Sequence, residues 1–101
     1  MDQDRFDAKV AAMVDGFFDL FNDLMSPGAL SSVEKELVAL GIATTKNCDP
    51  CINLHIDKCL ELGATPEEIM EAAGVGIVMA GGPACINVKK IANILKRKIK
   101  S

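Results

Sequence analysis

Apolar side chains recur along the first quarter of the chain at spacings of three and four residues. Such spacings place side chains on one face of a helix, so residues 4–24 are predicted to form an amphipathic helix. The apolar face consists of Phe6, Val10, Met13, Val14, Phe17, Phe21 and Leu24. Ser26, Pro27 and Gly28 follow directly and are expected to end this helix.

Two more helices are predicted from signals at their ends. Ser31 and Glu34 are spaced as in a capping box, in which a hydroxyl and a carboxylate bind free amides, so a helix is expected over residues 32–45. Lys46 and Asn47 supply a turn. A third helix over residues 48–62 then closes at Gly63.

The last two helices complete an all-α prediction. Thr65 caps a fourth helix that reaches residue 80, with Pro66 at its first position. This helix tolerates Gly74 and Gly76, which would let another helix approach closely. Residues 81–83 break the chain, and a fifth helix is expected over 84–98. No alternating strand pattern or internal repeat is found, so the sequence predicts one domain over residues 1–101 with five to six helices.

Length and composition limit the class of protein. A chain of 101 residues has no room for a second core, and an apolar share of 50% hints at contacts between subunits. The first residues are acidic and no apolar run follows them, so no secretory signal is predicted. The longest apolar stretch, residues 72–86, is shorter than the roughly 20 residues that a bilayer span needs. We therefore expect a cytoplasmic protein without a membrane partner.

Charge does not favour a nucleic-acid partner. The net charge is −3, and six of the 11 basic residues crowd the C-terminal end. They are Lys89, Lys90, Lys96, Arg97, Lys98 and Lys100. Nucleic-acid sites commonly interleave such cations with aromatic rings, but all four aromatic residues lie near the other end of the chain. The helix dipole favours cations in the last turns of a helix, which explains the cluster.

The third predicted helix carries the candidate chemistry. Cys48, Cys51, His55 and Cys59 are spaced by three, four and four residues, so their side chains share one helix face. Cys48 is expected in the first turn, where free amides and the helix dipole favour a thiolate. A CxxC pair at a helix start is suited to thiol–disulfide exchange, because one sulfur attacks and the other resolves. In an intracellular protein this spacing favours a redox dithiol over a metal site.

A zinc site and a haem attachment site are the alternatives for the same cysteines. A zinc site needs four ligands, but His55 is the only histidine, and Cys59 and Cys85 stand singly. Haem attachment requires a histidine directly after the second cysteine, where this chain has Ile52. We predict no metal and no cofactor, and we expect Cys59 and Cys85 to be small buried apolar side chains.

Glu36 interrupts an apolar helix face. If the second and third helices form an antiparallel hairpin that turns near Lys46, Glu36 lies level with residue 56, beside His55. One interpretation is an exposed glutamate with a lysine partner, which is common and contributes little. The other is a proton relay in which Glu36 orients His55, and His55 acts as a base toward Cys51. Position alone leaves both open.

These residues resemble a known family motif. Glu36, eleven intervening residues, the Cys48–Cys51 pair and His55 are arranged as in the alkyl hydroperoxidase D branch of the carboxymuconolactone decarboxylase-like superfamily. A Gly-Ala-Thr segment with acidic residues behind it, beginning at Gly63, strengthens the resemblance. It extends over roughly residues 30–85.

The resemblance implies an activity and an assembly. It implies a helical fold that forms rings, as a homotrimer or homohexamer, and a dithiol peroxidase or disulfide reductase. Cys51 would become the sulfenic acid, Cys48 would donate a proton and then resolve it, and Glu36 and His55 would form the relay. The substrate would be a hydroperoxide or a small disulfide, with an unidentified thiol as reductant.

The chain departs from the family pattern at two points. Pro50 stands where the hydroperoxidase has a histidine, and the chain lacks the additional helical half of the full-length enzyme.

Two other functions remain open for this sequence. One alternative function is the decarboxylase or isomerase chemistry of aromatic breakdown that names the superfamily, which does not depend on a cysteine pair. The other is a non-catalytic dithiol subunit that senses redox state or binds a metal.

Overall fold

The predicted all-α fold is confirmed in a computed structural model that describes residues 2–100. The helices of the described residues are α1 (Gln3–Met25), α2 (Ser32–Thr44), α3 (Asp49–Glu61), α4 (Pro66–Ala80) and α5 (Gly82–Lys100). No strand occurs between residues 2 and 100. Each of the first four helices begins and ends within about one residue of its predicted position.

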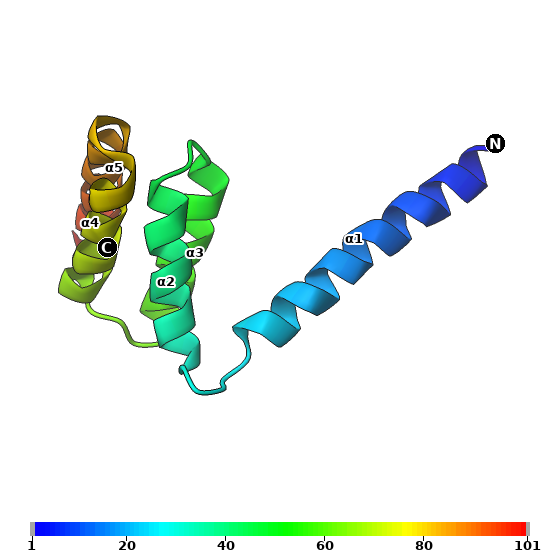
Figure 1. Cartoon of the computed structure of the whole chain (residues 1–101), viewed down its shortest axis with the longest axis horizontal. Coiled ribbons are helices and arrows are strands. Elements are labelled where there is room, and N and C mark those ends of the chain that lie inside the picture. Colours follow the sequence, from blue (N-terminus) through cyan, green and yellow to red (C-terminus); the bar gives the residue numbers. More distant parts are fainter. Residues whose placement is uncertain (1, 101) are drawn as a thin grey trace.

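Helices α2 to α5 form a compact bundle from which α1 projects (Figure 1). Helix α2 packs against α3 on one side and α4 on the other, and α4 also packs against α5. The core lies between these helices. Its buried apolar side chains include Leu40, Ala43, Ile52, Ile56, Cys59, Ile69, Ala73, Ile91 and Leu95.

The capping box predicted at Ser31 forms, and Thr65 caps α4 as expected. The Ser31 Oγ accepts the Glu34 amide at 3.1 Å, and the Glu34 carboxylate accepts the Ser31 amide at 2.8 Å. Hydrogen bonding of the Glu34 carboxylate to the Ser31 backbone amide, and less strongly to the Ser31 side chain, holds the pKa of Glu34 below its usual range. Thr65 and Glu68 make the same pair of bonds at the start of α4. The two starts fix where the chain enters α2 and α4.

The fifth helix begins earlier than predicted. The break is confined to Gly81, whose φ of 72° lies in the left-handed region that favours glycine. Gly82 and Pro83 are the first residues of α5 rather than part of the break. Proline is tolerated in the first turn of a helix, where its missing N–H has no partner to lose.

Glycines bring α2 and α4 close together. A Cβ atom on Gly76 would lie 2.9 Å from the carbonyl oxygen of Gly41, which leaves no room for any side chain. Gly41 is in turn packed against the backbone of Ala72. The close approach expected from the sequence is therefore found at Gly76. Nothing lies within 4 Å of the corresponding position on Gly74, so this glycine does not serve a close approach within the chain.

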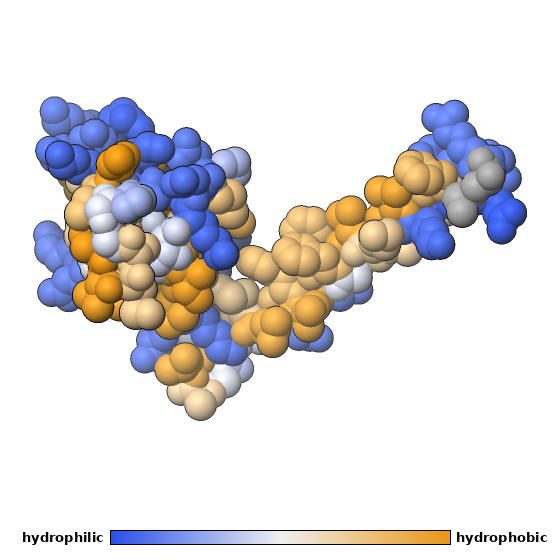
Figure 2. Space-filling model, turned by 45° about the horizontal axis from the view of Figure 1, so that its top comes forward, coloured by the Kyte–Doolittle hydropathy of each residue, from blue (hydrophilic) through white to orange (hydrophobic). Residues whose placement is uncertain are grey.

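Helix α1 has no buried residue. Its apolar side chains form an exposed stripe along the projecting arm, which Figure 2 shows as orange atoms. Only Phe21 and Met25, near the C-terminal end, are half-buried. None of the helices in residues 2–100 is both long enough and apolar enough to span a bilayer.

Candidate active site

The cysteine pair lies at the start of α3. Cys48 is the N-cap of the helix, one residue before the first turn in which it was expected, and Cys51 lies inside that turn. The two cysteines are joined by a disulfide across a Cα–Cα distance of 5.3 Å. The Cys51 amide donates a hydrogen bond to the Cys48 Sγ at 3.3 Å, and both residues are half-buried. A sulfur that accepts an amide at a helix N-terminus is a position that stabilises a thiolate.

Helix α5 fixes the turn that leads into this pair. The buried Asn87 side chain donates to the carbonyl oxygen of Thr44 at 2.9 Å and to that of Lys46 at 3.4 Å. Sequence reasoning missed this residue. The signal was available, because a polar side chain at position 87 interrupts the apolar face that Ala84 and Ile91 share on the same helix.

The buried pair of the site joins α2 to α3. Glu36 Oε2 lies 2.6 Å from His55 Nδ1, and the two residues are only 5% and 9% exposed. The hairpin register predicted from the turn near Lys46 is therefore correct. The alternative of an exposed glutamate paired with a lysine is wrong, because Glu36 faces the interior.

The geometry of this pair assigns different roles to the two histidine nitrogens. An ionised Glu36 can only accept a hydrogen bond, so Nδ1 of His55 carries the hydrogen between them. The neutral ring then has an unprotonated Nε2, which is the nitrogen that can act as a base. His55 follows Cys51 by four residues on the same face of α3. The arrangement can hold a proton next to a dithiol.

The other two cysteines differ from each other. Cys59 is fully buried on α3, and its burial, with a smaller contribution from the Glu36 carboxylate, raises the pKa of its thiol to about 11. It is therefore a protonated, inert side chain near neutral pH, as expected. Cys85 is exposed on α5, so the expectation that it is buried is wrong for this chain. It lies on the side of α5 opposite Ala84 and Asn87, which face the core.

An aromatic ring from α1 covers the histidine. Phe21 stacks on His55 with ring centroids 6.4 Å apart and an interplanar angle of 24°. Phe17 continues the row of rings, 6.2 Å from Phe21. Periodicity placed Phe21 in the apolar stripe of its helix but could not show which residue it would meet.

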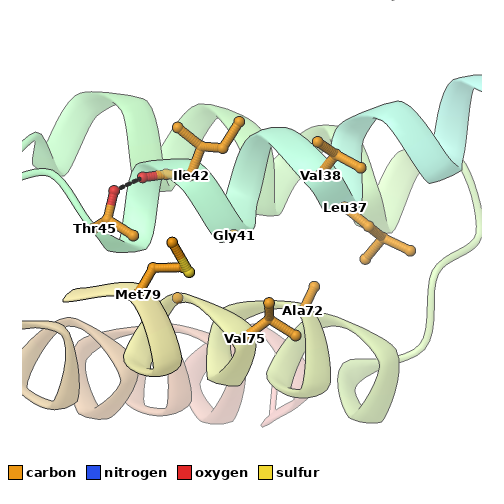
Figure 3. Close-up of a pocket in the computed structure, with 9 residues that line it drawn as sticks. Leu37, Val38, Gly41, Ile42, Thr45, Ala72, Val75 and Met79 are labelled. Carbon is orange, nitrogen blue, oxygen red and sulfur yellow. Dashed lines mark hydrogen bonds between the residues drawn. The ribbon is translucent and has the colours of Figure 1, made fainter. Parts of the chain in front are cut away.

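An apolar groove lies away from the dithiol. It has a volume of about 470 Å³ between α2 and α4 and is lined by apolar side chains such as Val38, Ile42, Val75 and Met79 (Figure 3). Neither cysteine of the pair lines it, nor does Glu36 or His55. Among residues 2–100 no three His, Cys, Asp or Glu side chains cluster in a way that could hold a metal ion.

Comparison with known families agrees with this arrangement. A sequence profile of the carboxymuconolactone decarboxylase family matches residues 11–93, which span all four site residues. The chain belongs to the carboxymuconolactone decarboxylase family. The match extends beyond the segment from which the resemblance was first drawn and includes the second half of α1.

The chain is similar to proteins and to solved structures from several bacteria. Uncharacterised proteins of Cupriavidus necator and of the cox locus of Paracoccus denitrificans are each 34% identical to the chain, over 82% and 84% of its length and 73% and 77% of their own. A family protein of Thermotoga maritima, for which a part in the antioxidative response has been suggested, superposes with a TM-score of 0.82 at 30% identity, covering 88% of this chain and 92% of that one. A Legionella pneumophila family protein gives the same TM-score and identity, covering 92% and 83%.

Proposed function

We propose that the protein is a thiol-dependent peroxidase that can also act as a disulfide reductase, with Cys48 and Cys51 as its working dithiol. One observation carries this proposal. The dithiol at the start of α3 shares a helix face with His55, whose ring is held by a buried carboxylate on α2. A thiol needs an adjacent base or a lowered pKa to react near neutral pH, and this arrangement offers a base.

The first half of the reaction oxidises Cys51. His55 takes the proton of the Cys51 thiol, and the thiolate attacks the terminal oxygen of a hydroperoxide. The O–O bond breaks, the terminal OH stays on Cys51 as a sulfenic acid, and the other oxygen leaves as an alcohol with the proton of Cys48. The resulting Cys48 thiolate is the sulfur that accepts the Cys51 amide at the helix start.

The second half forms the disulfide. Cys48 attacks the Cys51 sulfur, the S–O bond breaks, and hydroxide leaves as water with the proton stored on His55. The dithiol has then supplied two electrons, and the pair has reached the bonded arrangement with its Cα atoms 5.3 Å apart. An external thiol must reduce the disulfide by exchange. A cytoplasmic location, which remains a prediction, would provide such thiols.

Two features support this assignment over the alternatives. The decarboxylase chemistry that names the family does not need a dithiol, and a part in the antioxidative response has been suggested for the Thermotoga relative. A non-catalytic dithiol subunit would not need a buried carboxylate on its histidine.

Pro50 occupies the second position of α3, so no histidine is available there as a further proton carrier.

Turnover with defined substrates tests the proposal. The reduced protein is mixed with cumene hydroperoxide or a small disulfide in the presence of a dithiol reductant, and the products are measured. Turnover should be lost in Cys48→Ser and in Cys51→Ser and kept in Cys85→Ser, the exposed control. Absence of turnover with either substrate, together with stoichiometric zinc in the purified protein, would instead favour the metal-binding subunit.

We also propose that α1 is an assembly helix covered by a second copy of the chain. Its exposed stripe includes three phenylalanines, and aromatic side chains bury roughly 150–250 Å² each when covered. Together with the neighbouring aliphatic side chains, this stripe could supply a large part of the about 800 Å² per partner of a stable interface. The apolar groove between α2 and α4 of another copy is the proposed seat (Figure 3).

Charge supports a copy of the same chain as the occupant. Helix α1 carries five aspartates against two cations, whereas α5 carries six cations and no acidic residue. These helices lie apart within one chain (Figure 1). Assembly of several copies would let the acidic side of α1 approach a basic α5. A homotrimer or homohexamer remains the expected form.

A further inference from the structure

The contact between α1 and the rest of the chain is confined to the C-terminal end of that helix. Phe21 and Met25 are its only half-buried residues, and the remainder of α1 projects away from the bundle (Figure 1). The ring of Phe21 meets His55, the base of the proposed reaction. The short segment through which α1 contacts the bundle therefore lies at the candidate site.

A lysine of α2 anchors this end of α1. Lys35 Nζ donates to the carbonyl oxygens of Leu24 at 2.8 Å and Ser26 at 2.6 Å. These oxygens belong to the end of a helix, where carbonyls lack partners within the helix. Lys35 directly precedes Glu36, so one turn of α2 both supplies the carboxylate of the buried pair and anchors the helix that carries Phe21.

The Phe21 ring has two effects on the histidine that it covers. It adds apolar surface beside the imidazole, and a hydrogen bond between charged partners is stronger where water is excluded. Its π system also lies near a ring that becomes cationic when it accepts the thiol proton, with the centroids 6.4 Å apart, close to the limit of about 6 Å for a cation–π attraction. Both effects favour the state of the site in which His55 is protonated and Cys51 is a thiolate.

The titratable groups around His55 are few. Glu36 faces it from α2, while Cys51 and Cys59 lie one turn to either side on α3. From α1 the group in contact with its ring is the apolar Phe21. Phe21 therefore differs from the other neighbours of His55, because it affects the imidazole through packing and its π electrons rather than through a titratable charge.

We propose that Phe21 is a positioning residue that holds the His55 ring in its hydrogen bond with Glu36 and links the position of α1 to the activity of the dithiol. This inference rests on the proposed function for its kinetic consequence. Its structural part, the hold of Phe21 on the histidine ring, can be measured without turnover.

The test compares three variants with the wild-type protein. Phe21→Ala removes the ring, Phe21→Tyr keeps it, and Phe6→Leu changes an exposed phenylalanine near the other end of the same helix. Because His55 is the only histidine, its imidazole NMR signals need no separation from others. Thiolate content against pH, kcat and KM for cumene hydroperoxide, and oligomeric state are measured for each protein.

The inference predicts a specific pattern. Phe21→Ala should shift the imidazole signals, lower thiolate content at neutral pH and reduce kcat about 3- to 10-fold, the effect expected of one aromatic pair, with little change in KM. Phe21→Tyr and Phe6→Leu should keep the imidazole signals, thiolate content and kcat of the wild type. Unchanged histidine signals in Phe21→Ala would overturn the inference, as would equal losses in Phe21→Ala and Phe6→Leu, which would mark Phe21 as part of an assembly surface only.

Failure of the proposed function gives a different result. A wild-type protein without peroxidase or disulfide reductase activity would refute that function, while the imidazole signals and the thiolate titration would still show whether Phe21 holds His55.

Discussion

The Glu36 carboxylate and the His55 imidazole meet at 2.6 Å although they lie 19 positions apart in the chain. Their contact crosses from α2 to α3 inside the bundle, and each residue is almost inaccessible to solvent. Burying two polar side chains is unfavourable unless each satisfies the other. The two buried side chains therefore stabilise each other between the helices of the hairpin, and the pair supports the proposed relay to Cys51.

Replacing Glu36 by glutamine should uncouple this relay while keeping the fold. Glutamine is nearly the same size but neutral, so it would stabilise a protonated His55 less well. We expect less thiolate at neutral pH and a turnover slower by about 10²-fold or more. The exposed Glu61→Gln on α3 is the matched control and should have little effect.

A double variant tests whether Glu36 and His55 act as one unit. His55→Gln should slow turnover about as much as Glu36→Gln, and the double variant should be little worse than either, because members of one relay are not additive. Losses that multiply in the double variant would contradict the relay. So would normal rates and a normal thiolate titration in Glu36→Gln.

Alkylation of the reduced protein should distinguish Cys59 from Cys85 by their rates of labelling. Cys85 is exposed and should react readily with iodoacetamide, whereas Cys59 is buried and has a thiol pKa of about 11. Near neutral pH Cys59 is protonated, and its reactive thiolate should form only as the pH rises toward that value. Peptide mass spectrometry gives the order of labelling. Labelling of Cys59 as fast as Cys85 in folded protein would show that the helix α3 face is open.

Loss of Asn87 should weaken the turn before the dithiol. Asn87→Ala leaves the carbonyls of Thr44 and Lys46 without this donor, so we expect the free energy of unfolding to fall by about 1–3 kcal/mol. Asn93→Ala, an exposed asparagine of the same helix, should change it by less than about 0.5 kcal/mol. Denaturant unfolding measures both. Equal effects at positions 87 and 93 would exclude a structural role for the Asn87 hydrogen bonds.

Light scattering tests the proposed role of α1 in assembly. The wild-type protein should be a trimer or hexamer at micromolar concentration. Phe17→Asp in the stripe or Val38→Glu in the α2–α4 groove should shift it toward smaller species, because each buries a charge in the proposed contact. Phe17 and Val38 are both exposed within one chain, so these changes should not unfold it. A stable wild-type monomer would contradict the proposal.

Much of the site could be predicted because it depends on local helix geometry. That Glu36 and His55 lie at the same height in the helical hairpin follows from the turn near Lys46. That Cys51 and His55 share a helix face follows from helical spacing. The contact of Phe21 with His55 could not be predicted in this way. It depends on the direction in which the chain leaves α1 through residues 26–31, and no periodic pattern records that direction.

Other differences have similar causes. The exposure of Cys85 depends on which face of α5 turns toward the core, and that face carries Ala84, Asn87 and Ile91 rather than Cys85. Asn87 could have been identified, because its polar side chain interrupts an apolar face. Its partners, however, are backbone carbonyls more than 40 residues away. Contacts of that range require the tertiary arrangement.

The central claim is that hydroperoxide oxidises Cys48 and Cys51 to their disulfide, and counting thiols after a single turnover tests it most directly. Reduced protein is mixed with one equivalent of cumene hydroperoxide, the remaining thiols are titrated, and the disulfide is mapped by mass spectrometry. The account predicts the loss of the two thiols of the Cys48–Cys51 pair, one equivalent of alcohol, and a sulfenic acid on Cys51 that persists in Cys48→Ser and is absent in Cys51→Ser. Retention of all four thiols, or a disulfide that includes Cys59 or Cys85, would contradict it.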